Sequence, residues 1–115
     1  RLAGVLGASA VALGAFGAHG LKSVTTDASR LDSFKTGSTY HLIHSCALLA
    51  LASASATSKV SPNAVRIAAW CWLGGIALFS GSLYVYGATG SKAVVRIAPI
   101  GGTLYIAGWA VLALL

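Results

Sequence analysis

The feature that most constrains this chain is the distribution of its ten charged side chains. They leave four charge-free intervals, residues 2–21, 36–58, 67–91 and 97–115, each between 19 and 25 residues long. A helix needs about 20 mostly apolar residues to cross the hydrocarbon core of a bilayer. Each interval meets that requirement, so the sequence predicts a membrane protein with four spanning helices.

Composition excludes the soluble classes of protein. Only 9% of the 115 residues are charged, whereas a soluble domain carries about a quarter charged residues. A net charge of +6 would favour nucleic acid as the partner of a soluble chain. Here the basic residues flank apolar intervals, where they anchor helices at the membrane surface, and we expect no nucleic-acid partner.

We expect an all-α membrane protein that forms one domain over residues 1–115. The expected spans are about 2–21, 34–56, 62–87 and 96–115. The Ser61-Pro62 pair is typical of a helix start and places the beginning of the third span. Because the connections are short, the four helices should alternate in direction as an up-down bundle.

The segment between the first two spans carries charges of both signs. Thr26 or Asp27 is expected to cap a short separate helix there, with Leu31 and Phe34 on its membrane side. The first span instead offers small residues at fourfold spacing, a pattern that lets helix backbones approach closely in lipid. These small residues are Gly4–Ala8–Ala12 and Ala10–Gly14–Ala18.

Alternation of the helices divides the basic residues between two ends of the bundle. Three lie toward the end that holds both termini, namely Arg1, Lys59 and Arg66, and five lie toward the other, namely Lys22, Arg30, Lys35, Lys92 and Arg96. The positive-inside rule places the five-charge end in the cytoplasm or an organelle's inner compartment. We expect anionic lipid headgroups at these five residues. Trp70, Trp72 and Trp109 are expected in an interfacial belt at the opposite end.

Polar side chains gather in the half of the bundle nearer the five-charge end. The expected polar cluster comprises His19, His41, His44, Ser80, Ser82 and Tyr84. We interpret it as structural, because polar groups in lipid must find hydrogen-bond partners. Metal ligation by three imidazoles, haem ligation and a quinone pocket are the alternatives.

The same residues give little support to catalysis. Both carboxylates, Asp27 and Asp32, lie outside the apolar intervals, which argues against ion-coupled transport. The serines lack a Gly-x-Ser-x-Gly elbow. We therefore expect no catalytic residue, no metal ion and no cofactor. Cys46 and Cys71 are expected to be buried, small and apolar rather than disulfide-bonded.

Five segments resemble a known family in order and spacing. They are residues 14–21 (GAFGAHGL), 40–49 (YHLIHSCALL), 78–84 (LFSGSLY), 98–104 (APIGGTL) and the pair Gly108-Trp109. The chain resembles the transmembrane protein two-five-six family, whose bacterial relatives form a domain of unknown function. The resemblance implies a small four-helix membrane protein in which His19 and His44 are shared positions. The histidine at position 41 resembles the eukaryotic branch of the family.

The functional hypothesis is a structural accessory subunit of a larger membrane complex. The eukaryotic-type motifs and the absence of an initiator methionine are compatible with an imported protein. We therefore expect the mitochondrial inner membrane, and a respiratory-chain or ATP synthase assembly. An accessory subunit of a photosynthetic complex is a variant. A small carrier or ligand-binding protein that uses the polar cluster is the alternative from another class.

Overall fold

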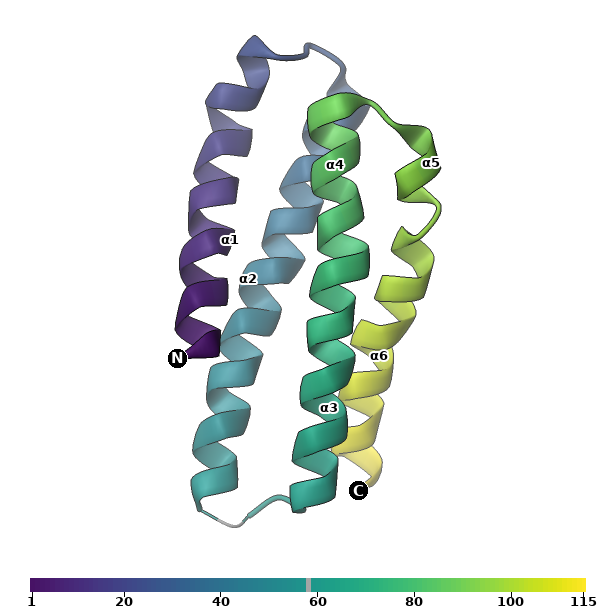
Figure 1. The fold of residues 1–115 in the computed structure, drawn as a ribbon. Coiled ribbons are helices and arrows are strands. Elements are labelled where there is room, and N and C mark those ends of the chain that lie inside the picture. Colours follow the sequence, from purple (N-terminus) through teal and green to yellow (C-terminus); the bar gives the residue numbers. More distant parts are fainter. Residues whose placement is uncertain (58) are drawn as a thin grey trace.

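A computed structural model describes residues 1–57 and 59–115, and these residues form helices and no strand. The described helices form four long arms, and Figure 1 shows that these arms alternate in direction, with the N and C termini toward the same end. The molecule measures 48 × 25 × 16 Å, so its long axis exceeds the hydrocarbon core of about 30 Å. The all-α, up-down architecture expected from the charge-free intervals is confirmed.

The first two arms form an antiparallel pair. Helix α1 (Leu2–Ala18) leads through the short 3-10 helix η1 (Gly20–Ser23) into α2 (Ala28–Ala56). Asp27 caps α2, because its Oδ1 accepts a hydrogen bond of 2.9 Å from the Ser29 backbone N–H. The cap was expected on a separate short helix; instead the helix continues from Ala28 through the whole second arm.

Phe34 corrects a second expectation in this region. Its side chain is 2% exposed and lies in the protein interior, not on the membrane side. Glycines on two neighbouring arms make room for the ring, since an added Cβ would lie 2.7 Å from Phe34 at Gly17 and 2.8 Å at Gly87. Phe34 therefore joins α1, α2 and the third arm near one end of the bundle.

The third arm is one continuous helical segment with an irregular middle. It consists of α3 (Pro62–Gly75), the π-helical segment η2 (Ile76–Ser80) and α4 (Gly81–Thr89), and it ends at Gly90 with φ 75°. As expected, the helix begins at Pro62. A π-helical turn adds one residue to the helical repeat, and such turns are frequent at functional sites.

The fourth arm starts at Lys92, earlier than the expected residue 96, and is broken after its first turn. The single turn α5 (Lys92–Val95) precedes α6 (Ala98–Leu114), which carries Pro99 in its first turn. Helix α6 packs against α3 and η2, and α2 packs against η2 and α4. The shared core contains Leu51, Trp72, Ile76 and Tyr105.

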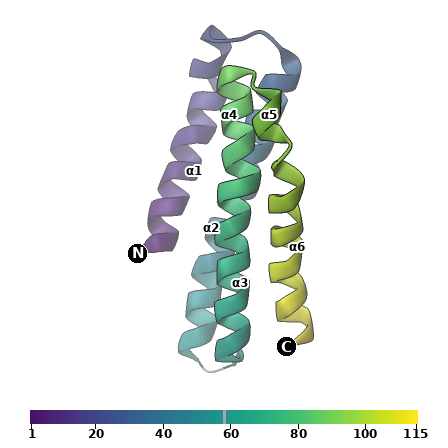
Figure 2. The same cartoon turned by 45° about the vertical axis from the view of Figure 1, so that its right-hand side comes forward.

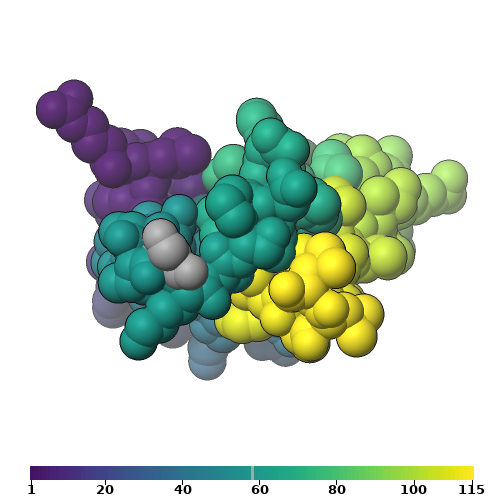
Figure 3. All heavy atoms as spheres, turned by 90° about the horizontal axis from the view of Figure 1, so that it is seen from below, coloured from purple at the N-terminus to yellow at the C-terminus, as the bar shows by residue number. Residues whose placement is uncertain are grey.

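Helix α1 lies at the edge of the molecule. Its packing is almost entirely against α2, and Figure 2 shows it leaning away from the third and fourth arms. In the view along the bundle (Figure 3), the purple N-terminal residues and the yellow C-terminal residues lie on opposite sides of the teal middle of the chain. One side of α1 is therefore left uncovered by the rest of the chain.

The third and fourth arms are long and apolar enough to cross a membrane, over Pro62–Thr89 and Lys92–Leu114. Helix α1 is apolar but has only 17 residues. Helix α2 has 29 residues, but its polar side chains lower its hydropathy. The crossing of the first two arms remains a prediction. Among the cysteines, Cys71 is half-buried but Cys46 is exposed, contrary to expectation.

Candidate functional site

His41 connects three arms of the bundle. It lies on α2 and is 4% exposed. Its Nδ1 is 2.8 Å from the Tyr84 hydroxyl on α4, and its Nε2 is 3.5 Å from Ser9 Oγ on α1. Since hydrogen bonds between helices hold membrane bundles together, His41 acts as a polar link from α1 to α4.

His44, one turn further along α2, uses both ring nitrogens. Nδ1 is 2.7 Å from the Tyr40 carbonyl oxygen, and because a carbonyl only accepts, Nδ1 carries the proton. Nε2 accepts a hydrogen bond of 3.1 Å from Trp109 Nε1 on α6. The ring also stacks on Tyr105, with 3.8 Å between centroids and 11° between planes. His44 is thus a neutral imidazole without a free lone pair for a metal or haem iron.

A second buried pair ties the π-helical segment to α6. Ser80, the last residue of η2, is fully buried, and its Oγ lies 2.9 Å from the Tyr105 hydroxyl. Nearby, Ser82 of α4 donates within the same arm to the Phe79 carbonyl of η2 at 2.9 Å. The π-helical turn therefore presents a hydroxyl to the fourth arm.

The expected polar cluster is divided by the structure. The His41–Tyr84 pair and the Ser80–Tyr105 pair are separate hydrogen-bonded units, and Ser82 bonds only locally. His19 is exposed at the end of α1 and is not brought to the other histidines. Four partners were missed by sequence reasoning, namely Ser9, Tyr40, Tyr105 and Trp109.

Trp72 lies in the protein interior instead of in the expected belt, whereas Trp109 packs against it and is 48% exposed. Trp72 is 1% exposed, and its ring centroid is 4.6 Å from that of Trp109 and 5.8 Å from that of His44. Trp70, at 70% exposure, points outward as expected of an interfacial residue. Position 109 follows Tyr105 by one helical turn, and this spacing is the signal that places both on the face toward α2.

Within the described ranges, no group of three or more His, Cys, Asp or Glu side chains lies close enough to hold a metal ion. The arrangement instead joins helices by hydrogen bonds and aromatic contacts. Beside it, a groove of about 380 Å³ opens between α2, η2 and α6. This aromatic groove is lined by Tyr40, His44, Phe79, Pro99, Gly102, Thr103, Tyr105, Ile106 and Trp109.

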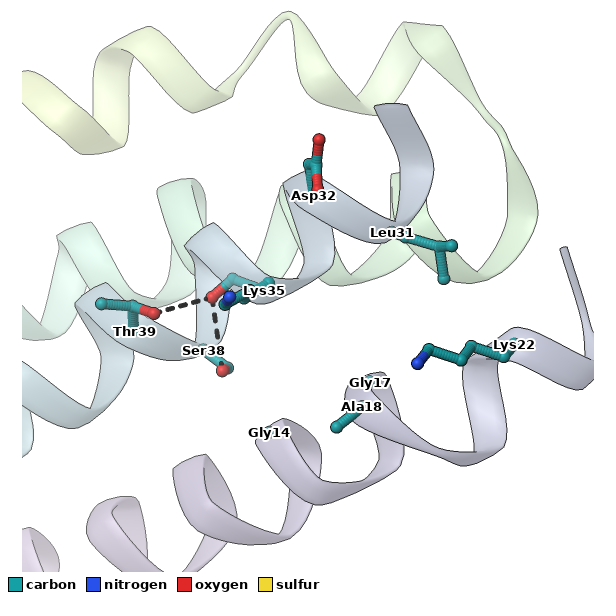
Figure 4. Close-up of a pocket in the computed structure, with 9 residues that line it drawn as sticks. All are labelled: Gly14, Gly17, Ala18, Lys22, Leu31, Asp32, Lys35, Ser38 and Thr39. Atoms are coloured by element: carbon teal, nitrogen blue, oxygen red, sulfur yellow. Dashed lines mark hydrogen bonds between the residues drawn. The ribbon is translucent and has the colours of Figure 1, made fainter. Parts of the chain in front are cut away.

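The five basic residues near the 22–35 and 92–96 segments are not equivalent. Arg30 caps the end of α4, since Nε and Nη2 donate to the carbonyls of Gly87 and Ala88 at 3.1 and 2.9 Å. The other four basic residues, Lys22, Lys35, Lys92 and Arg96, are exposed. Figure 4 shows Lys22 and Lys35 beside a pocket of about 510 Å³ between α1 and α2. We call this space the basic pocket.

Comparison with known proteins assigns the chain to a family. The family model described as "Protein of unknown function (DUF423)" matches residues 13–102. No solved structure matches the chain. The matched region includes His41 and His44 of α2, the whole of η2 and the first turn of α6.

Several bacterial membrane proteins are similar over most of their length. The chain is 46% identical to a UPF0382 membrane protein of Haemophilus influenzae, over 90% of this chain and 80% of the relative. It is 41% identical to the UPF0382 membrane protein YwdK of Bacillus subtilis, over 87% and 80%. It is 37% identical to the UPF0382 inner membrane protein YgdD of Escherichia coli, over 89% and 76%.

These relatives support an integral membrane location for the chain, and they are bacterial. The eukaryotic branch expected from the resemblance stays a prediction. The bacterial side of that resemblance is confirmed by the family match. On these matches, the chain belongs to the DUF423 family of membrane proteins.

Proposed function

We propose that the chain is a non-catalytic structural subunit that joins a larger membrane assembly through the outer face of α1. The observation that carries this proposal is the free small-residue face. Gly4 has no atom within 4 Å of the position of an added Cβ, and Ala8 and Ala12 are exposed. These three residues were expected to pack, and in the isolated chain nothing packs on them.

The opposite face of α1 shows how such residues are used. At Gly14 an added Cβ would lie 3.2 Å from Ser38 Oγ, and at Gly7 it would lie 3.9 Å from Ser45 Cβ. Helix α1 therefore already uses one small face for close packing on α2. Small faces are favourable in lipid because they let a second backbone approach, so the outer face suits another helix.

The buried polar residues support a structural role. Both nitrogens of His44 are occupied within the chain, and the Ser80 hydroxyl is paired with Tyr105. These groups stabilise the bundle. A subunit of this kind needs no catalytic residue and no cofactor of its own.

The resemblance to the transmembrane protein two-five-six family adds a membrane and a host assembly to the proposal. It favours the mitochondrial inner membrane, with a respiratory-chain or ATP synthase assembly as host, and a photosynthetic complex as the variant. The similarity to bacterial membrane proteins supports only the membrane location.

A photoreactive amino acid at position 8 tests the proposal in native membranes, with position 106 on α6 as the control. Ile106 is 70% exposed. We expect a defined protein adduct at position 8 and lipid adducts at position 106. Mass spectrometry of the adduct names the neighbour.

A matched pair of substitutions completes the test. Ala8→Leu should release the chain from its complex in mild-detergent native gels, whereas Ala110→Leu, the same change on an exposed site of α6, should not. Lipid adducts alone at position 8, adducts only with a second copy of this chain, or an unchanged complex for Ala8→Leu would overturn the proposal.

Binding of a flat apolar ligand of the quinone type is the second candidate. The aromatic groove favours it, because about 380 Å³ falls within the range of small-molecule sites. A short-chain quinone should quench Trp109 fluorescence saturably, and Thr103→Phe, which fills the groove from an exposed position, should abolish saturation. Equal, non-saturating quenching in both proteins would exclude this candidate.

A further inference from the structure

The basic pocket lies between the last turns of α1 and the first turns of α2. Gly14, Gly17 and Ala18 form one wall, and the opposite wall comes from Leu31 to Thr39 of α2. Figure 4 shows the Lys22 side chain extending from η1 toward the gap between the two helices. With about 510 Å³ of space, the pocket is large enough for a lipid headgroup.

Its position in the bundle matches the membrane surface. Lys22 follows the end of α1 and Lys35 lies about two turns into α2, while Gly14 lies about one helical turn before the end of α1. In a spanning bundle, basic residues at helix ends lie at headgroup level. The pocket thus has a charged rim at that level and an apolar continuation toward the acyl chains.

The electrostatics of the rim favour an anion. The lining residues include two lysine ammonium groups and only one carboxylate, that of Asp32, so the net charge of the lining is positive. In Figure 4 that carboxylate points away from α1. The hydroxyls of Ser38 and Thr39 lie 3.4 and 3.0 Å from the Lys35 carbonyl, to which they donate. The lysines therefore supply the charged hydrogen-bond donors that a phosphate needs.

We propose that the basic pocket binds the phosphate of a phospholipid with a net negative headgroup, held by Lys22 and Lys35. Basic pockets between membrane helices bind anionic headgroups in this way. Arg30 is excluded from the site because its guanidinium caps α4. The proposal is independent of which protein covers the outer face of α1.

Native mass spectrometry of the purified full chain, titrated with phosphatidylglycerol or phosphatidylcholine, tests the proposal. We expect tighter binding of phosphatidylglycerol, and Lys22→Gln/Lys35→Gln should weaken it by about 30-fold, as two interfacial lysines imply. The control Lys92→Gln/Arg96→Gln removes the same charge at the same end and should change the affinity by less than about threefold.

Further measurements distinguish binding in the pocket from attraction by diffuse positive charge and from binding of free phosphate. Ala18→Phe fills the pocket from an exposed position without changing any charge, and should also abolish the preference. Equal losses in the two double variants would overturn the proposal, as would retained binding in Lys22→Gln/Lys35→Gln. Inorganic phosphate alone should not compete at millimolar concentration; full competition would assign the pocket to a free anion instead.

Discussion

Gly101 is the closest contact between the fourth arm and the π-helical segment. An added Cβ there would lie 2.8 Å from both the Leu78 carbonyl carbon and Phe79 Cα, and closer still to the Phe79 nitrogen. All three are backbone atoms, so no side chain can rotate away. We predict that Gly101→Ala separates α6 from η2 and destabilises the bundle.

The neighbouring glycine provides a matched control. At Gly102 an added Cβ would lie 3.6 and 3.8 Å from the ring of Phe79, which is ordinary van der Waals contact. Both substitutions raise helix propensity equally, so that effect cancels in the comparison. At Gly101 the backbones must move apart by at least about 0.6 Å to restore normal separation, and such overpacking costs about 1–3 kcal/mol.

The assay is unfolding in dodecyl maltoside micelles with rising mole fraction of sodium dodecyl sulfate, followed by the helical circular dichroism band. Gly101→Ala should unfold at a lower detergent fraction than Gly102→Ala, with a difference of about 2 kcal/mol in unfolding free energy. Equal midpoints for the two variants would refute the close approach of α6 to η2.

Three further substitutions probe the polar links with the same assay. Tyr84→Phe removes the hydroxyl bonded to His41 and should cost about 0.6 kcal/mol, a typical interhelical hydrogen bond in lipid; no measurable loss would count against that link. Tyr105→Phe leaves the fully buried serine of η2 without its partner and should cost more, about 1–3 kcal/mol. Arg30→Gln removes two hydrogen bonds from the end of α4 and should cost about 1–2 kcal/mol, whereas Lys35→Gln, at an exposed position, should stay within about 0.5 kcal/mol.

The helical arms follow directly from the sequence because charged residues are costly inside a bilayer. Asp27 and the Ser61-Pro62 pair also mark real helix starts. The prediction of a separate helix before residue 34 was wrong, because charge marked the membrane surface there and not a break in the helix. Helix α2 continues past Arg30, whose side chain bonds to the end of α4.

The polar contacts were predicted only in part. The sequence correctly indicates that His41 and His44 share an inward face, since they are three residues apart. Their partners depend on how far each arm is rotated about its axis. The π-helical turn at Ile76–Ser80 changes that rotation for every residue after it. No pattern in the sequence predicted this turn.

The packing of the small-residue face of α1 was also predicted only in part. Spacing identifies small faces but not which one is used, because that choice depends on the position of α2. The structure turns Ala10 into the interior at 1% exposure and leaves Gly4 in the open. The proposed function depends on the face that the chain itself does not cover.

If all four arms cross the membrane, successive connections alternate between its two sides. Single cysteines in a Cys46→Ala/Cys71→Ala background test it, at Thr26→Cys, Thr57→Cys and Ser91→Cys, with a membrane-impermeant maleimide applied to sealed vesicles of one orientation. Positions 26 and 91 should react from one side and position 57 from the other. Labelling of positions 26 and 57 from the same side would show that the second arm does not cross, and would contradict a four-span arrangement.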